Sequence, residues 1–359
     1  MRRRDLLVSA AAAATLAAPN VARSQTPKVR WRLASSFPRP LKLLFKGCTQ
    51  FAKRVGELTD GAMEIQVFAG GEIVPPLGVF DAVSSGTVEC GHTLSLYYTG
   101  KNKALAFESG VPFGMTARQH SAWMLAGGGL ELTRELLAKS NIVNFPFGNT
   151  GAQMGGWFRK EIKSLDDFKG MRMRIPGLGS FVLSRLGVVP QSIPASDTYS
   201  ALERGTIDSV EWVGPYDDEV LGYYKVAKYY YFPGFWDCAA QNSLYVNKAA
   251  WEGLPAQFRS AIEVASHESY TTMLADYDAN NMLAMRRLLG HGVEVKPFPK
   301  DFMEAAYKET FKMYEEDQAQ NPDFARIYGP WLDFREKIIN WFRVSEGSYE
   351  FFVYNQRKG

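Results

Sequence analysis

Cysteine and histidine are scarce in this sequence of 359 residues, with three and four copies respectively. Cys48, Cys90 and Cys238 lie too far apart to form a Cys-x-x-Cys metal motif. An odd set of cysteines at apolar positions is typical of buried thiols. No two histidines have metal-ligand spacing. The sequence therefore predicts neither a disulfide nor a zinc site.

Catalytic motifs are also missing. The sequence has no Gly-x-Ser-x-Gly elbow, no phosphate-binding loop and no His-Glu-x-x-His pair. Gly177 and Gly179 follow a strand-like segment, but the third glycine of a dinucleotide-binding turn would fall at Val182. We therefore predict that the protein is not an enzyme. An exported small-molecule enzyme is the alternative, and it would need a nucleophile and base that the sequence does not reveal.

The mature chain lacks an excess of charge. The total of 41 basic against 38 acidic residues gives a net charge of +3, and the first 24 residues carry all of that excess. A neutral body offers no electrostatic attraction to nucleic acid or to an anionic membrane surface. We therefore expect neither partner.

Residues 1–24 have the pattern of an export signal. Arg2, Arg3 and Arg4 precede an apolar stretch that is too short for a confident membrane span, and small residues precede Gln25. Adjacent arginines before an apolar segment fit a twin-arginine signal, which exports folded proteins, although an ordinary secretory signal is the alternative. We predict a periplasmic protein.

Strand and helix patterns alternate through the body of the chain. Residues 29–33, 63–67 and 88–96 are strand-like, and helical patterns separate them. Residues 80–89 align without gaps to residues 199–208: each has an amphipathic helix, then glycine, threonine, a β-branched residue and an acid. Any helix-to-strand turn could look similar, but we favour two related lobes.

The predicted fold is α/β and periplasmic-binding-protein-like, with two α/β lobes of mixed sheets around a ligand cleft and long C-terminal helices. We predict that lobe I comprises residues 25–148 with about 240–265, and that lobe II comprises 149–239 with about 266–320. Residues 321–359 form a C-terminal helical segment. We expect Ser196 to cap a helix in lobe II, and Pro330 to separate an aromatic helix at 331–344 from the preceding segment.

Candidate ligand-binding side chains lie where predicted strands end. Arg174 follows Arg172 at strand spacing, and its planar guanidinium could pair with a carboxylate, although an exposed strand arginine would fit either position. Glu211 and Trp212 end the strand after the second Gly-Thr turn. Other amide side chains at crossings or strand starts are Asn149, Gln153, Gln241 and Asn242. Carboxylate and amide oxygens from separate strand ends could hold a hard cation.

Three segments carry a family resemblance: residues 169–177 (KGMRMRIPG), residues 201–208 (ALERGTID), and the Glu211-Trp212 pair that follows. With the arginine-rich start, they resemble the solute-binding proteins of tripartite ATP-independent periplasmic (TRAP) transporters. Within that family the sequence is most similar to the branch that binds 2-oxo acids with sodium. The resemblance implies two lobes that close on a small organic acid, and a membrane permease as partner.

The resemblance also implies a site. Arg174 would pair with the ligand carboxylate, and a cation would be held by Gln153, Glu211, the backbone carbonyl of Trp212, and Gln241. Ser95 and Tyr97 would complete the anion pocket, with Tyr98 and Asn149 as competitors for that place. An acid at position 211 beside an anionic ligand needs a shared cation.

The predicted ligand is a pyruvate-like 2-oxo monocarboxylate with a sodium ion. Sodium is preferred because only one carboxylate is evident and a divalent ion favours more oxygen ligands. A lactate-like 2-hydroxy acid with calcium is the alternative. The resemblance further implies a homodimer that exchanges its terminal helix, and the alternative is that this helix folds back on its own lobe.

Overall fold

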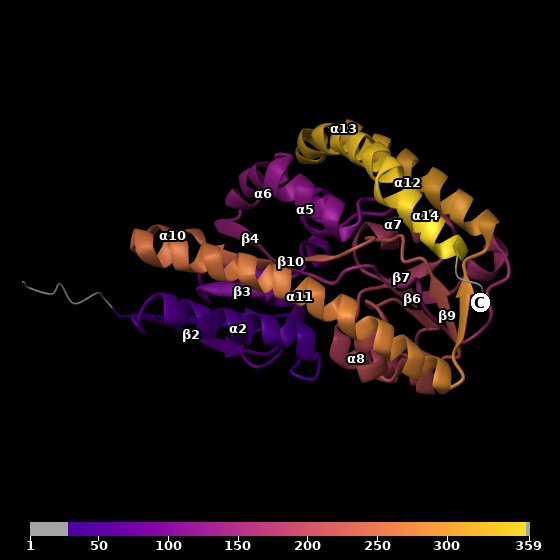
Figure 1. Cartoon of the computed structure of the whole chain (residues 1–359), viewed down its shortest axis with the longest axis horizontal. Helices are drawn as coiled ribbons and strands as arrows, with labels where there is room; N and C mark the ends of the chain where they lie inside the picture. Colours follow the sequence, from indigo (N-terminus) through magenta and orange to yellow (C-terminus); the bar gives the residue numbers. More distant parts are fainter. Residues whose placement is uncertain (1–27, 357–359) are drawn as a thin grey trace, which may run out of the picture.

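The computed structural model describes residues 28–356, so the predicted export signal lies outside the described residues. Two mixed β-sheets, each covered by helices, form the two α/β lobes that the sequence predicts (Figure 1). We keep the names lobe I and lobe II for these sheets and their covering helices. The predicted residue boundaries of the lobes stay a prediction. None of the described helices is long and apolar enough to cross a membrane.

Lobe I is built on a five-stranded sheet of order β2-β1-β3-β10-β4. Strands β2, β1 and β3 run parallel, and β10 is antiparallel to both of its neighbours. The strands are β1 (Val29–Ser35), β2 (Met63–Phe68), β3 (Cys90–Thr93), β4 (Ile142–Asn149) and β10 (Gln241–Asn247). The helices are α2 (Lys42–Leu58), α3 (Val79–Ser84), α4 (Ala106–Ser109), α5 (Ala117–Ala126), α6 (Gly129–Ala138) and α10 (Lys248–Glu252), with a short 3₁₀ turn η2 (Ser95–Tyr98) after β3.

Lobe II is built on a six-stranded sheet of order β11-β9-β5-β8-β6-β7. Strand β5 is antiparallel to both neighbours, and the other pairs are parallel. The strands are β5 (Gly156–Phe158), β6 (Arg172–Arg174), β7 (Val189–Gln191), β8 (Ser209–Val210), β9 (Tyr229–Phe232) and β11 (Glu294–Pro297). The helices are α7 (Gly177–Arg185), α8 (Ala195–Glu203) and α9 (Pro215–Leu221).

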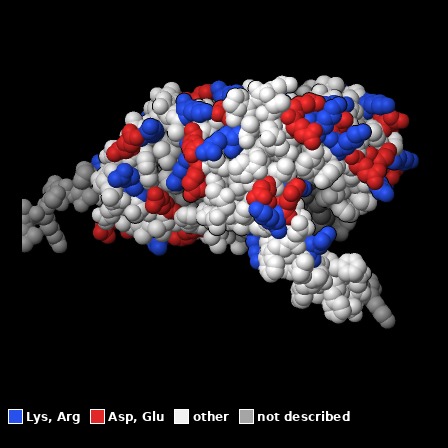
Figure 2. All heavy atoms as spheres, turned by 90° about the horizontal axis from the view of Figure 1, so that it is seen from above, with Lys and Arg blue, Asp and Glu red and all other residues white. Residues whose placement is uncertain are grey.

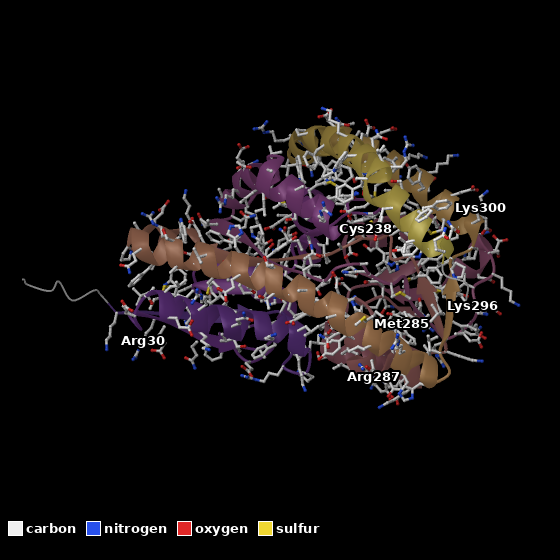
Figure 3. The ribbon with its side chains drawn as sticks, in the orientation of Figure 1. Arg30, Cys238, Met285, Arg287, Lys296 and Lys300 are labelled. Carbon is white, nitrogen blue, oxygen red and sulfur yellow. The ribbon has the colours of Figure 1, made fainter. Side chains whose placement is uncertain are left out.

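One helix of 35 residues, α11 (Ala256–Gly290), runs along both lobes (Figure 1). At a rise of 1.5 Å per residue it is about 50 Å long. It packs against α2 and β4 of lobe I and against α9 of lobe II. Near its end Arg287, labelled in Figure 3, forms an ion pair with Glu219 on α9 at 2.6 Å. The helix therefore ties the two lobes together.

The aligned segments 80–89 and 199–208 perform the same structural task in the two lobes. Gly86 and Gly205 both adopt a positive φ, 75° and 71°, which a side chain rarely tolerates. The acid that follows each glycine then clamps an arginine of the neighbouring strand: Glu89 accepts from Arg32, and Asp208 accepts from Arg172, each from the side chain and from the backbone N–H. The repeat thus fixes a strand to its neighbour in each lobe.

Two local expectations are wrong. The N-cap of α8 is Pro194, and Ser196 lies inside the helix, because the proline already sets the extended conformation that a helix start requires. Pro330 does not interrupt the helix either, since α13 (Pro322–Val344) is continuous through it. Its packing against the rest of the chain outweighs the lost backbone hydrogen bond.

The C-terminal helices α12 (Lys300–Gln320), α13 and α14 (Glu346–Gln356) cover one side of the molecule (Figure 1). The first half of α13 packs on its own chain: Trp331 is buried, with its ring 5.3 Å from that of Phe107. On α13 and α14 the exposed large apolar side chains are Trp341, Val344, Tyr349, Phe351, Phe352 and Tyr354. The predicted aromatic helix at 331–344 is therefore buried at its start and exposed only toward its end.

Candidate functional site

A small cavity lies between the lobes, where β6 and β8 end and where η2 follows β3. Its lining comes from both lobes: Phe37, Leu44, Leu94, Leu96, Tyr97, Thr150, Gln153, Arg174, Pro176, Glu211, Trp212, Val213 and Asp237. The cavity measures about 10 Å³, close to the space that one water molecule needs. A three-carbon acid does not fit this space, so it enters only when the two lobes separate.

Arg174 is the only basic side chain among these lining residues. It is 2% exposed, and its Nη1 donates to the backbone oxygen of Glu211 at 2.6 Å and to the carboxylate Oε2 at 3.3 Å. Nε donates to the carbonyl of Ile193 at 3.1 Å, and the guanidinium lies 4.6 Å from the centre of the Trp212 ring. These contacts hold a fully desolvated positive charge in one orientation.

Arg172, two residues earlier on the same strand, has a different role. Its guanidinium pairs with Asp208 at 2.8 Å, and its side chain is 43% exposed. The sequence left both arginines as candidates for the ligand site. The structure places only Arg174 on the cavity.

Two carboxylates face the same cavity, those of Glu211 and Asp237. Burial raises the pKa of Glu211 well above its usual range, the nearby Asp237 raises it further, and Arg174 opposes the rise. Burial likewise raises the pKa of Asp237 to about 7, against the influence of Arg174. One arginine cannot neutralise two carboxylates in this cavity, so the pair retains protons that a cation could replace.

These raised pKa values make the stability of the fold depend on pH. The folded chain binds protons that the unfolded chain has already lost, because an ordinary aspartate titrates near pH 4. The stability of the protein alone therefore falls as the pH rises from about 4 to the folded pKa of Asp237, about 7. A cation bound by the ionised carboxylates opposes this loss.

The side chain of Gln153 meets both carboxylates. Its amide end lies 3.0 Å from Oδ1 of Asp237 and 3.3 Å from Oε1 of Glu211. With Nε2 toward them it donates to both, and its oxygen accepts from Thr150 Oγ1 at 2.9 Å. When the amide is rotated by 180° about its last side-chain bond, its oxygen instead faces the carboxylates of Glu211 and Asp237. Gln153 can therefore donate hydrogen bonds to the two carboxyl groups, or offer its oxygen to a cation bound between them.

The donor set fits a hard cation. Among residues 28–356 there is no group of three or more His, Cys, Asp or Glu side chains that could hold a metal ion. The converging atoms are instead carboxylate and amide oxygens, the ligands that sodium and calcium take. The residues present therefore fit a sodium or calcium ion, which Glu211, Asp237 and Gln153 could hold.

The structure brings together five of the predicted site residues: Tyr97, Gln153, Arg174, Glu211 and Trp212 all line the cavity. The phenol of Tyr97 lies near Arg174, whose charge works against the rise that burial causes in the pKa of Tyr97.

Three predicted residues do not line the cavity. Ser95 is buried, and its hydroxyl lies near Glu108 and Tyr245 in the interior of lobe I. Asn149 accepts from the backbone N–H of Gly151 at 2.9 Å. Gln241 is also fully buried, and neither its amide oxygen nor its nitrogen has a hydrogen-bond partner among the described residues. Their roles stay predictions.

Asp237 is the functional candidate that the sequence analysis missed. It belongs to the loop between β9 and β10, and the next residue, Cys238, is labelled in Figure 3. Gly234 lets this loop approach closely, since a Cβ there would lie 2.6 Å from the carbonyl oxygen of Met154. The sequence feature that could have revealed Asp237 is its position as the single acid in the aromatic stretch 229–240, because an acid among apolar residues rarely lacks a partner.

The arrangement of two α/β lobes closed over a desolvated arginine defines a solute receptor of the periplasmic-binding type. Comparison with known proteins gives the family: the profile of DctP, described as bacterial extracellular solute-binding protein family 7, matches residues 34–321. The chain belongs to this family, as a TRAP solute-binding protein.

Several relatives cover nearly the whole chain. The monocarboxylate 2-oxoacid-binding periplasmic protein of Nostoc sp. is 48% identical over 361 aligned positions, which cover 98% of this chain and 99% of that protein. A TRAP solute-binding protein of Bordetella bronchiseptica, solved with copurified calcium and picolinate, is 52% identical with a TM-score of 0.91, covering 92% of this chain and 98% of its own.

Two further solved relatives hold pyruvate. The one from Pseudoalteromonas atlantica, with sodium and pyruvate, is 36% identical with a TM-score of 0.87. The one from Colwellia psychrerythraea, with calcium and pyruvate, is 37% identical with the same TM-score. Each covers 90% of this chain and 98% of its own.

Replacement of Arg174 by lysine should weaken binding of the organic acid. Lysine keeps the charge but loses the planar fork and the contacts to Ile193 and Glu211, which we expect to cost about 2 kcal/mol, or roughly thirtyfold in Kd. Arg172→Lys is the matched control, since that residue serves Asp208 and should change Kd less than twofold. Calorimetric titration of both variants measures the difference, and equal affinities would remove Arg174 from the site.

Proposed function

We propose that this protein is the periplasmic receptor of a TRAP transporter for a small 2-oxo monocarboxylate of the pyruvate type, bound together with a metal cation and delivered to the membrane permease. The observation that carries the proposal is the single desolvated cation Arg174 beside two carboxylates that share one amide, Gln153. The relatives that hold pyruvate with sodium or calcium support it. Export through a twin-arginine signal in residues 1–24 is part of the same proposal.

The polar end of the cavity suits one carboxylate only. Arg174 would receive the ligand carboxylate as a planar bidentate partner, in place of its contact with the Glu211 carboxylate. The cation, when bound, would neutralise the carboxylates and polarise the 2-oxo group of the ligand. Its protein ligands would be Glu211, Asp237, Gln153 and the backbone carbonyl of Trp212.

The apolar end of the cavity suits a short alkyl group. Phe37, Leu44, Leu94 and Leu96 form this wall, and all four belong to lobe I. A second carboxylate on the ligand would be buried against it without a cationic partner, which is costly. We therefore propose that the receptor rejects C4-dicarboxylates and prefers a methyl or small alkyl substituent.

The identity of the cation depends on charge. The sequence-based preference for sodium assumed one carboxylate, and Asp237 supplies a second. With both carboxylates ionised, the ligand carboxylate and Arg174 leave a net charge of −2 in the closed cavity, which a divalent ion neutralises. We therefore propose calcium ahead of sodium, and sodium requires that the carboxylate pair keep one proton.

Pyruvate binding should depend on calcium or sodium. In buffer with potassium as the only metal ion and a chelator present, we expect calorimetry to show at least a hundredfold weaker binding, because three like charges then share one arginine. Asp237→Asn should weaken calcium-supported binding more than sodium-supported binding, since it removes the charge that favours the divalent ion.

Glu64→Gln, which changes an exposed acid that pairs with Arg30, is the control and should bind like the natural protein. Full affinity without either metal ion would reject the cation site. Tighter binding of lactate than of pyruvate would show that the receptor prefers 2-hydroxy acids. Tighter binding of succinate than of pyruvate would reject the monocarboxylate assignment.

We further propose a homodimer that forms through α14 and the end of α13. None of the residues of α14 is buried, and Phe351 is 73% exposed. Figure 2 shows this end of the chain standing out from the body with a mostly uncharged surface. Such a helix gains about 25 cal/mol for each Å² of apolar area that a second subunit removes from water. The dimeric relative from Bordetella bronchiseptica supports the proposal.

Removal of α14 should convert the dimer to a monomer without unfolding it. A chain that ends at Ser345 should give a monomer mass in light scattering at micromolar concentration and keep its melting temperature. Trp341→Ala should weaken the dimer in the same assay, whereas Trp331→Ala should lower stability by about 3–5 kcal/mol because that ring fills the core of its own chain. A monomeric full-length protein, or a dimer that survives loss of α14, would contradict the proposal.

A further inference from the structure

Two neighbouring aspartates on α9, Asp217 and Asp218, are buried and lie outside the cavity. Each accepts a short hydrogen bond from a fully buried tyrosine: Tyr277 donates to Asp217 at 2.7 Å, and Tyr230 donates to Asp218 at 2.6 Å. Burying a carboxylate costs free energy unless other groups compensate for it, so the contacts of each aspartate need to be identified. The two differ in what else they reach.

Asp218 serves the sheet of lobe II. Its Oδ2 also accepts from the indole of Trp157 on β5 at 2.9 Å, and the ring of Trp157 stacks on that of Tyr230 at 4.1 Å. Both aromatic residues are core residues of lobe II with no place on the cavity. The Oδ1 of Asp218 accepts from the backbone N–H of Val213 at 3.4 Å, so Asp218 fixes α9 to the sheet and to the segment that follows β8.

Asp217 reaches the cavity through one residue. Its Oδ2 is used by Tyr277, while Oδ1 is buried without a partner among the described residues. The indole Nε1 of Trp212 is buried and unpartnered as well, and the indole lies close enough to Asp217 to oppose the effect of burial on the pKa of that carboxyl group. Trp212 lines the cavity, and its ring lies under the guanidinium of Arg174.

We propose that Asp217 is a positioning residue for the ligand site: it orients the Trp212 indole beneath Arg174 and is itself held by Tyr277 on α11. The two unpartnered atoms, Asp217 Oδ1 and Trp212 Nε1, are a complementary acceptor and donor. The orientation of the Arg174 fork therefore depends on a side chain of the helix that spans both lobes.

The link from α11 to α9 is reinforced on both sides of Asp217. Asn281, one turn further along α11, accepts from the backbone N–H of Tyr216, and Arg287 pairs with Glu219. Helix α9 is therefore fixed to α11 at three points, which gives Asp217 a rigid base from which to orient Trp212. The same helix contacts α2 and β4 of lobe I, so the positioning extends from one lobe to the other.

Two tyrosine variants of equal size provide the test. Tyr277→Phe and Tyr230→Phe each remove one buried hydroxyl from one of the neighbouring aspartates, so both should lower the melting temperature by similar amounts. Only Tyr277→Phe should weaken calcium-supported pyruvate binding, by about tenfold, because only Asp217 orients the residue beneath Arg174. In a Trp212→Phe background, Tyr277→Phe should produce no further loss of affinity.

A second readout needs no ligand. The indole N–H signal of Trp212, assigned in a ¹H–¹⁵N spectrum by its absence in Trp212→Phe, should shift in Tyr277→Phe and stay in place in Tyr230→Phe. The proposal rests on the proposed function only for the affinity measurement. If the natural protein fails to bind pyruvate, the ligand assignment fails and the indole signal still decides the positioning role. Equal effects of the two tyrosine variants on both readouts, or none from Tyr277→Phe, would overturn the proposal.

Discussion

The site depends on one imbalance of charge: a single desolvated arginine faces two carboxylates in a cavity that holds about one water molecule. Arg174 alone cannot stabilise both Glu211 and Asp237 in ionised form, so their pKa values rise and the pair keeps protons in the protein alone. A metal cation resolves the imbalance and leaves Arg174 available to an anionic ligand. In the proposed function, binding of the cation and binding of the acid are therefore coupled.

The fold supplies these groups from separate parts of the chain. Arg174 ends β6, Glu211 follows β8, Gln153 lies in the segment between the lobes, and Asp237 lies in the loop that returns to lobe I. The apolar wall comes from lobe I, so the cavity exists only when the lobes are closed. Helix α11 spans both lobes and, through Tyr277 and Asp217, also reaches the residue on which Arg174 rests.

Much of this arrangement was predictable from the sequence, and the remainder was not for physical reasons. Alternating strand and helix patterns predict the α/β class, and the aligned segments 80–89 and 199–208 predict two related lobes. The strand end at Arg174 and the acid at 211 were recognisable because their neighbours form specific motifs. Asp237 was not, because its role depends on a loop conformation that Gly234 permits, and periodicity carries no information on loops. The continuity of α13 through Pro330 was missed because tertiary packing overrides a local helix breaker.

The central claim is that a cation replaces protons on the Glu211 and Asp237 carboxylates. Calorimetric titration of calcium into the protein with pyruvate, at pH 6 in buffers of different ionisation enthalpy, measures the protons released. Because burial raises the pKa of Glu211 well above its usual range and that of Asp237 to about 7, more than one proton should leave for each calcium bound. The release should fall by about one proton in Asp237→Asn. A heat that does not depend on the buffer in the natural protein, or an unchanged release in Asp237→Asn, would contradict the claim.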